Sequence, residues 1–397
     1  MNSVIEILFW ISAIIIFYTY IGYGIIMLIL VKIKDLFVRK RDHNFSEEEL
    51  PSITLLIAAY NEASIIEEKM KNCDSLKYPK EKFQILWVID GSNDNSNELL
   101  KNYTNVKVCY SPERKGKTAA LNHGITMVET DYVVFTDANT ILNENAIYEI
   151  AQCFADDKVG CVAGEKRIIV KDKDGASSGG EGLYWKYESK LKELDSRLYS
   201  AVGAAGELFA IKTSLYRFMP EDTLLDDFML SMQIAKDGYI IKYCSDAFAC
   251  ETGSVDLFNE QKRKVRISAG GLQSIYRLLP LLNIFKYGLL SFEYISHRVL
   301  RWTITPVLFF MIFPLNLYLA LFSDNVIYKL IFIAQLLFYF ISLLGYSLRN
   351  KEVKRKSVFV PLYFIFMNLN VIKAVPYLIK NKGKGSWEKA KRIYTTS

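Results

Sequence analysis

Histidine and cysteine are scarce in this chain. Among 397 residues there are three histidines and six cysteines, and no two cysteines form a Cys-x-x-Cys pair. Zinc sites need clustered Cys and His ligands at short, regular spacings, so a zinc-binding protein is disfavoured. A disulfide framework is equally unexpected, and we predict reduced cysteines in a folded core.

An excess of charge of one sign is also missing, since the net charge is only +6. A nucleic-acid-binding protein would need a basic stripe on its folded domain, and none is visible, so we expect no nucleic-acid partner. The basic residues flank the apolar regions instead. Such clusters are typical of cytoplasmic segments that face anionic lipids, which makes membrane lipids expected partners. The flanking residues are Lys32, Lys34, Arg39, Lys40, Arg41, Arg349, Lys351, Lys354, Arg355 and Lys356.

Long apolar runs are present at both ends of the chain. Val4 to Val31 is long enough to span a bilayer, and its positive charge follows the apolar run, which favours an anchor over a cleaved signal peptide. Thr303 to Phe322 and Val326 to Leu348 form a second, hairpin-like pair of spans. Together they predict an integral protein of the cell inner or plasma membrane, with the middle of the chain in the cytosol.

The apolar segment Val358 to Ile379 is ambiguous. A full span would place the basic tail outside, against the positive-inside rule, so a re-entrant or interfacial segment is favoured and a spanning helix stays open. Its polar and helix-breaking residues are Pro361, Asn368, Asn370, Lys373 and Pro376.

The middle of the chain alternates apolar runs with helical patterns. Uniformly apolar strands that alternate with helices predict an α/β fold with a parallel, doubly wound sheet. Ligands bind at the carboxyl ends of the strands in such sheets. The expected strands are 53–58, 83–89, 106–108 and 132–136, and the expected helices are 62–73, 94–103, 118–127 and 145–154.

Acids and amides follow three of these strands. Carboxylates and amides at one sheet edge suit a nucleotide diphosphate and a divalent cation. The residues are Ala59, Tyr60, Asn61 and Glu62 after the first strand, Asp90 and Ser92 after the second, and Asp137, Ala138 and Asn139 after the fourth.

A basic turn, Arg114 to Lys117, precedes the helix that begins near Thr118. A basic, glycine-containing turn at a helix start can receive a phosphate group. The spacing differs from that of a Walker A loop, and an exposed basic loop is the alternative.

These motifs together resemble the family 2 glycosyltransferases over roughly Pro51 to Gln273. The matching motifs are Ala58-Ala59-Tyr60-Asn61-Glu62, Asp90-Gly91-Ser92, Gly116-Lys117 with Ala119 to Asn122, and Asp137-Ala138-Asn139 at the D-x-D position. The resemblance implies a GT-A fold, a nucleotide-diphospho-sugar donor, and a divalent metal, Mg²⁺ or Mn²⁺. The metal would be held at Asp137 and Asn139, where an amide replaces the second acid of the motif.

The resemblance also implies a catalytic base in an acid pair that opens a helix. Asp226-Asp227 fits better than Glu221-Asp222, because the following helix 228–236 ends at Gly238 as in the family pattern. We assign the base to Asp227 and a supporting role to Asp226; the alternative role of the pair is helix capping. Gly203, Gly206 and Glu207 resemble the acceptor-side loop of the family.

Processive members of the family carry Q-x-x-R-W, and this chain departs from that motif. Gln261 is present, but Lys264 stands at the Arg position and Val265 at the Trp position. The loss of an aromatic surface argues against a processive role. Arg263 and Arg266 are candidates for binding the diphosphate, with membrane-surface cations as the alternative.

The sequence therefore predicts a membrane-bound inverting glycosyltransferase that uses a lipid-linked or glycan acceptor in cell-surface polysaccharide synthesis. The alternatives are a processive synthase that extrudes its product, and a transporter or scaffold with a nucleotide-binding domain. The expected division is 1–31 anchor, 32–50 cytosolic linker, 51–256 GT-A domain, 257–302 interfacial helices, 303–348 hairpin, and 349–397 re-entrant or spanning segment with a basic tail.

Overall fold

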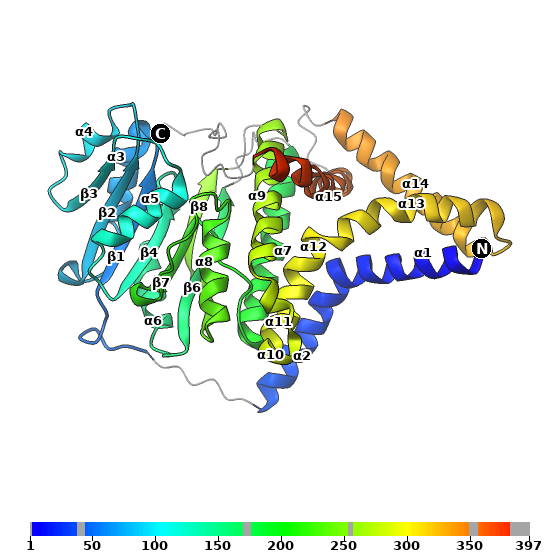
Figure 1. Ribbon diagram of the computed structural model, residues 1–397, viewed down its shortest axis with the longest axis horizontal. Coiled ribbons are helices and arrows are strands. Elements are labelled where there is room, and N and C mark those ends of the chain that lie inside the picture. The colour runs from blue at the N-terminus through cyan, green and yellow to red at the C-terminus, as the bar shows by residue number, and fades with distance from the viewer. Residues whose placement is uncertain (1, 38–43, 170–175, 253–256, 349–355, 382–397) are drawn as a thin grey trace.

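The computed structural model describes residues 2–37, 44–169, 176–252, 257–348 and 356–381. An α/β domain lies at one end and an arm of long helices at the other, with further helices between them (Figure 1). Most of the basic flanking residues, including Arg39 to Arg41, Arg349 to Arg355 and the tail beyond Asn381, lie outside the described residues.

The predicted parallel strands form the first half of one eight-stranded sheet, in the order β3-β2-β1-β4. These strands are β1 (Ile53–Ala59), β2 (Phe83–Asp90), β3 (Val106–Ser111) and β4 (Tyr132–Asp137). The connecting helices α3 (Ile66–Asp74), α4 (Ser96–Leu100), α5 (Lys117–Gly124) and α6 (Ala146–Cys153) confirm the alternating pattern.

The other half of the sheet is mixed, so the prediction of a parallel sheet holds for the first four strands and not for the rest. β7 (Leu208–Lys212) pairs antiparallel with β4 and with β6 (Val159–Ile169). The sheet ends with β8 (Ile240–Thr252), parallel to β6, and β5 (Ile141–Leu142), antiparallel to β8. An antiparallel neighbour needs no crossover helix. Because β7 runs backwards, the residues that precede it lie beside the carboxyl end of β4.

Two hydrophobic clusters cover the two faces of the sheet. On one face, Ile66 and Met70 of α3 and Ile150 of α6 pack on the strands. On the other, Leu121 of α5 and Leu230 of α8 (Asp226–Lys236) do the same. The sheet is thus buried on both sides, which explains its uniformly apolar strands.

A group of helices joins this domain to the arm. α7 (Ala176–Leu198) packs on α2 (Tyr23–Phe37), and α9 (Leu257–Arg277) packs on α15 (Lys356–Lys380). The chain between α9 and the arm folds into the short helices α10 (Ile284–Tyr287), α11 (Leu289–Tyr294) and α12 (Leu300–Trp302).

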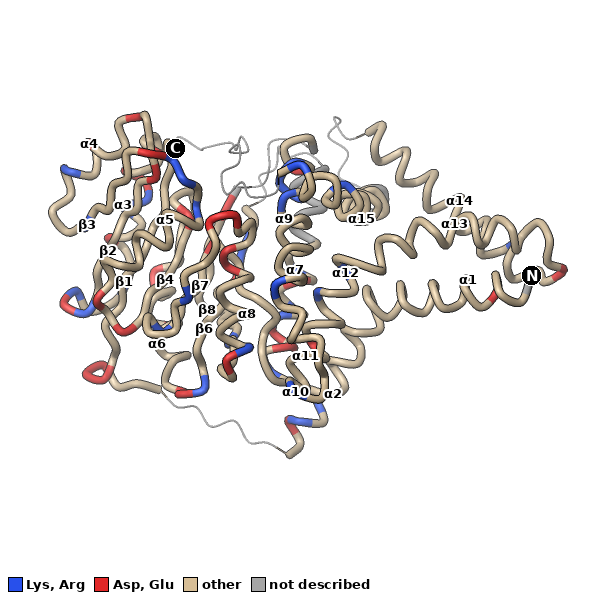
Figure 2. The backbone as a smooth tube through the Cα atoms, in the orientation of Figure 1, with Lys and Arg blue, Asp and Glu red and all other residues tan. Residues whose placement is uncertain are grey.

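The arm contains α1 (Asn2–Phe17), α13 (Ile304–Phe322) and α14 (Val326–Ser347). Figure 2 shows few charged residues along these helices. Within the described residues, four helices are long and apolar enough to cross a membrane: Ser3–Phe37, Ile304–Phe322, Val326–Ser347 and Phe359–Lys380. The chain is therefore an integral membrane protein.

The first of these helices continues beyond the predicted anchor. A π-helical turn at Tyr18–Gly22 separates α1 from α2, and the helix changes direction there (Figure 1). Its 35 residues would extend roughly 52 Å if straight, more than a bilayer core requires. The second part, α2, packs against α7 instead.

α15 is one continuous helix in spite of Pro361 and Pro376. Figure 1 shows it almost end-on, whereas α1 and α13 run across the view, so α15 crosses those two helices. That orientation agrees with the interfacial alternative, while its length also suits a span. The placement of this segment and the proposed division into domains stay predictions.

Substitution of Gly203 would test how the chain packs against Phe228 of α8. It has a φ of +83°, and an added Cβ would lie 2.2 Å from the Phe228 ring, whereas the Cβ of an alanine at Gly238 (φ +99°) would meet nothing within 4 Å. Both substitutions incur the left-handed backbone cost of about 1 kcal/mol, and Gly203→Ala adds overpacking of about 1–3 kcal/mol. We expect Gly203→Ala to have the lower apparent melting temperature in detergent. Equal melting temperatures would contradict this packing.

Candidate active site

A cleft of about 1740 Å³ opens at the carboxyl ends of the parallel strands. It is bordered by the strand ends, α7 and α9, and it continues to α15 and to α1 of the arm. Most of the residues predicted from the sequence line this cleft. They are Ala59, Tyr60, Glu62, Asp90, Arg114, Lys117, Asp137, Ala138, Asn139, Gly206, Glu207, Asp226, Asp227, Gln261, Arg263, Lys264 and Arg266.

Asn61, Ser92 and Gly203 do not line the cleft. Asn61 has a φ of +53° and donates its backbone N–H to Ser92 Oγ at 3.0 Å. This bond ties the turn after β1 to the turn after β2. Both residues thus shape the strand ends, and Gly203 lies against Phe228.

Asp90 is buried and holds the basic turn in place. Its Oδ1 accepts the N–H of Lys115 at 2.9 Å, and its Oδ2 accepts the N–H of Gly116 at 2.8 Å. Each carboxylate oxygen has a second lone pair. Asp90 can therefore order the turn and still accept a hydrogen bond from a nucleobase, which remains its predicted role.

Lys117 links the two groups of predicted acids. Its Nζ donates to Asp137 Oδ1 at 2.8 Å and lies 3.7 Å from Asp226 Oδ2. Burial opposes the charged form, but the carboxylates of Asp137 and Asp226 outweigh it and raise the pKa of Lys117. A permanent positive charge therefore lies between the strand-end acid and the acid pair of α8.

Asp227 stands in the first turn of α8. Its Oδ1 accepts the N–H of Phe228 at 2.8 Å. Burial raises the pKa of Asp227 to about 7, and the neighbouring Asp226 carboxylate adds to this effect. A carboxylate with a pKa near the working pH is suited to general-base catalysis. Asp226 Oδ2 is a buried atom that accepts no hydrogen bond from the described residues.

The loop that contains Gly206 and Glu207, predicted to lie on the acceptor side, passes close to the Asp227 carboxylate. A Cβ on Gly206 would lie 3.2 Å from both Asp227 Oδ2 and Lys117 Nζ, so only glycine allows this approach without displacement. Glu207 forms an ion pair with Lys166, which also pairs with Glu251 at 2.6 Å.

Asn139 joins the same charged network. Its Nδ2 donates to Glu251 Oε1 at 3.3 Å, and Glu251 lies 3.9 Å from Arg263 of α9. Arg263 and Lys264 also pair with Glu260 of their own helix, at 3.6 Å and 3.4 Å. This network connects the D-x-D position to α9.

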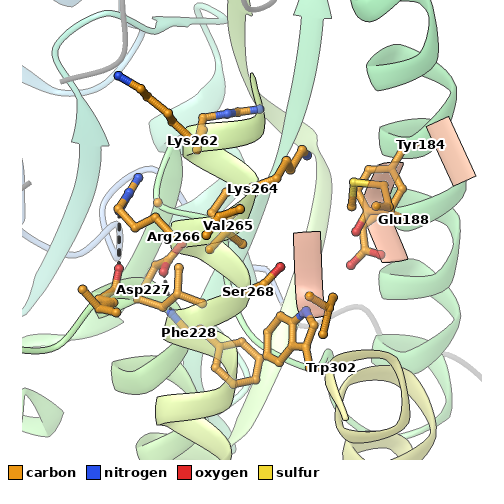
Figure 3. Close-up of a pocket in the computed structure, with 18 of the residues that line it drawn as sticks. Tyr184, Glu188, Asp227, Phe228, Lys262, Lys264, Val265, Arg266, Ser268 and Trp302 are labelled. Atoms are coloured by element: carbon orange, nitrogen blue, oxygen red, sulfur yellow. Dashed lines mark hydrogen bonds between the residues drawn. The ribbon is translucent and has the colours of Figure 1, made fainter. Parts of the chain in front are cut away.

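Figure 3 shows Arg266 and Asp227 close together on one wall of the cleft, and Glu188 and Tyr184 of α7 across from them. Arg266 donates to the Leu224 carbonyl at 3.5 Å, which keeps the guanidinium beside the acid pair. Val265 lines the cleft at the position where the family motif has Trp.

Sequence reasoning missed a second set of lining residues, on α7 and around α12. Arg298 and Arg301 both pair with Glu188, and Trp302 packs edge-on against Phe228 at 5.1 Å between ring centroids. Lys192 of α7 also lines the cleft. No short motif marks these residues; two arginines within the predicted interfacial segment were the only signal.

A divalent cation fits this site through one protein carboxylate. No group of three or more His, Cys, Asp or Glu residues suitable for a metal occurs in the described part of the chain. Mg²⁺ is commonly held by one or two carboxylates together with substrate phosphates and water. Asp137, which is partly exposed in the cleft, can supply that carboxylate. Asn139 can add its amide oxygen, since only its nitrogen is used by Glu251.

Comparison with a solved structure shows that this domain has the GT-A fold. The mannosyltransferase PcManGT from Pyrobaculum calidifontis, solved with GDP-Man and Mn²⁺, matches with a TM-score of 0.66 at 20% identity, over 94% of this chain and 99% of that chain. At this identity the likeness shows the fold. Residues 54–217 match the family model "Glycosyl transferase family 2", so the chain carries a family 2 glycosyltransferase domain.

Two relatives of this chain share one name with each other. A poly-beta-1,6-N-acetyl-D-glucosamine synthase of Staphylococcus aureus (strain COL) is 32% identical over 241 residues, which are 58% of this chain and 57% of the relative. The chain thus matches a little over half the length of that protein. The synthase of the same name from Staphylococcus epidermidis is 23% identical over 389 residues, which are 90% of this chain and 92% of the relative.

The assignment of the base is tested by Asp227→Asn. An amide of the same shape cannot accept the acceptor's proton, so we expect turnover to fall by about 10²- to 10⁴-fold. Binding of the donor nucleotide, measured by calorimetry, should change little. Full turnover in this variant would show that Asp227 is not the general base.

The acid pair should also set the pH dependence. A base with a pKa of about 7 is protonated below that pH, so kcat/KM should rise through pH 7 and level off above it. In Asp226→Asn the neighbouring negative charge is gone, so the pKa of Asp227 falls and the rising limb moves to lower pH. If kcat/KM of Asp226→Asn rises at the same pH as in the wild type, the two carboxylates do not influence each other.

Proposed function

We propose that this protein transfers a sugar from a nucleotide-diphospho-sugar to a lipid-linked or glycan acceptor at the cytosolic face of the membrane, in cell-surface polysaccharide synthesis. The observation that carries the proposal is the Lys117 bridge, which brings Asp137 and the acid pair of α8 into one cleft. That cleft continues into the membrane helices. Basic residues at the ends of the predicted spans support the cytosolic placement.

The proposed reaction is a single displacement. The acceptor hydroxyl approaches the anomeric carbon from the side of Asp227, and its proton passes to the Asp227 carboxylate as the new C–O bond forms. The bond from the anomeric carbon to the diphosphate breaks on the opposite face, and its electron pair leaves with the nucleotide diphosphate. Attack opposite the leaving group inverts the anomeric configuration.

The charges of the cleft suit this leaving group. Lys117 and Arg266 lie beside the acid pair and can stabilise the negative charge that develops on the diphosphate. A divalent cation, Mg²⁺ or Mn²⁺, held by Asp137 and Asn139, would supply further charge neutralisation when bound. Arg114 lies over the Tyr60 ring at 3.9 Å, which keeps it at the predicted donor side.

A processive synthase is the second candidate. It is favoured by the name of the two staphylococcal relatives, which also makes N-acetylglucosamine the first donor sugar to test. Val265 argues against it, because the position offers no aromatic surface to a growing polymer. The length of the product separates the candidates: one added sugar for single transfer, and long chains at low conversion for a synthase. A transporter or scaffold gains no support from the family match.

The donor site is tested by Asp137→Ala. Without this carboxylate, the metal-dependent part of donor binding should be lost, so Mn²⁺ or Mg²⁺ should no longer increase the affinity for the nucleotide sugar. The measurement is calorimetric titration of the full-length protein with a panel of nucleotide sugars, with and without metal. The matched control is Asp131→Ala, an exposed acid at the opposite end of β4 that bonds Ser52. Equal metal dependence in Asp137→Ala and the wild type would refute the assignment.

A further inference from the structure

The lining of the cleft changes from charged to apolar with distance from Asp226 and Asp227. Near Asp227 its walls are charged, whereas Ala13, Ile16 and Phe17 of α1, Ile312 of α13, and Phe364 and Met367 of α15 form an apolar end of the lining. Polar lining residues from the same part of the chain are Tyr363, Asn368, Lys373, Tyr377 and Asn381. None of the six apolar side chains has an N–H or O–H donor or an oxygen acceptor. The apolar end therefore lies among helices that are candidates to cross the membrane.

Between the apolar end and the charged end lies a set of polar contacts made by Tyr20, Asn368 and Tyr187, which we call the collar. Tyr20 donates to Asn368 at 2.6 Å and packs against Phe364 at 4.5 Å between ring centroids, so it links the π-helical turn to α15. The Tyr187 hydroxyl donates to the Tyr20 carbonyl at 2.6 Å and accepts from Arg301. These contacts hold the collar at the point where the lining turns from polar to apolar.

Three cations line the cleft where the collar meets the catalytic end. Arg298, Arg301 and Lys192 line the cleft there, and Glu188 is the acid that pairs with both arginines. Arg301 is almost fully buried, and its Nε has no hydrogen-bond partner among the described residues. Burial, together with the nearby Arg298, lowers the pKa of Lys192, as expected where cations crowd together. An anionic group is the ligand that such a cluster suits.

We infer that the acceptor is an amphiphile whose hydrocarbon chain occupies the apolar end of the cleft and whose phosphate lies at Arg298 and Arg301. Its sugar or hydroxyl end then reaches Asp227. The inference rests on the proposed function and narrows the acceptor to the lipid-phosphate class. A polar polymer leaving through this end would find no N–H or O–H donor and no oxygen acceptor on the six apolar side chains, which costs free energy.

The binding site for the hydrocarbon chain is tested with a series of acceptors. All share one phosphoryl head group and carry hydrocarbon chains from ethyl to a long isoprenoid, each used below its micellar concentration. With wild-type protein, KM should fall by about fourfold for each methylene that enters the cleft. Ile16→Trp and Met367→Trp fill the apolar end, so this gain should be largely lost. The matched controls are Ile14→Trp and Leu369→Trp, exposed positions on the same helices that do not line the cleft. They should keep the wild-type dependence.

The phosphate is tested by comparing two acceptors of equal chain length, one joined through a phosphate and one without it. We expect at least a tenfold lower KM for the phosphate-linked acceptor, and inorganic phosphate should compete with it. A KM independent of chain length, an equal loss in the cleft variants and their controls, or equal KM values for the two head groups would overturn the inference. Donor binding and slow donor hydrolysis, followed in parallel, report on the proposed function separately, because neither needs an acceptor.

Discussion

The bridge from Lys117 to Asp137 and Asp226 is the interaction on which the site depends. It joins a strand end in the parallel half of the sheet to the start of α8, which follows the antiparallel strand β7. Without the cation, three acids would face one another in a partly buried cleft, and their repulsion would favour protonation. With it, the Lys117 ammonium offsets part of this repulsion, and Asp227 keeps a pKa of about 7. One ammonium group thus allows three carboxylates to share the cleft.

The mixed sheet brings the parts of this site together. In a wholly parallel sheet, the loop before β7 would lie at the amino ends of the strands, far from Asp137. Since β7 is antiparallel to β4, with Leu208 opposite Thr136, Gly206 and Glu207 reach the carboxyl edge. Glu207 then pairs with Lys166, whose second partner Glu251 bonds Asn139. The direction of one strand therefore links the loop before β7 to the residues at the D-x-D position.

Much of this was predictable from sequence, for identifiable reasons. The four parallel strands and their helices follow from apolar runs between helical patterns, and the acids follow from their position just after those strands. The direction of β7 was not predictable, because antiparallel and parallel strands of five residues look alike in sequence. The partnership of Asp90 with the 115–116 turn was hidden too, since it depends on a backbone conformation that only the fold defines. Glu188, Arg298 and Arg301 escaped notice because their roles arise from packing between α7 and the helices that follow α9.

The same packing explains why an enzyme of this kind would be built into a membrane. α2 leaves the direction of α1 and packs on α7, and the Tyr23 hydroxyl donates to Asp195 of α7 at 2.5 Å. Asp195 in turn bonds His297. Glu188, about two turns away along the same helix, bonds Arg298 and Arg301. The anchoring helix and the wall of the cleft are thus parts of one hydrogen-bonded unit. A shift of α2 would move Arg298 and Arg301 relative to Asp227, so the membrane helices help to position the wall of the cleft that carries these arginines, which is the proposed acceptor side.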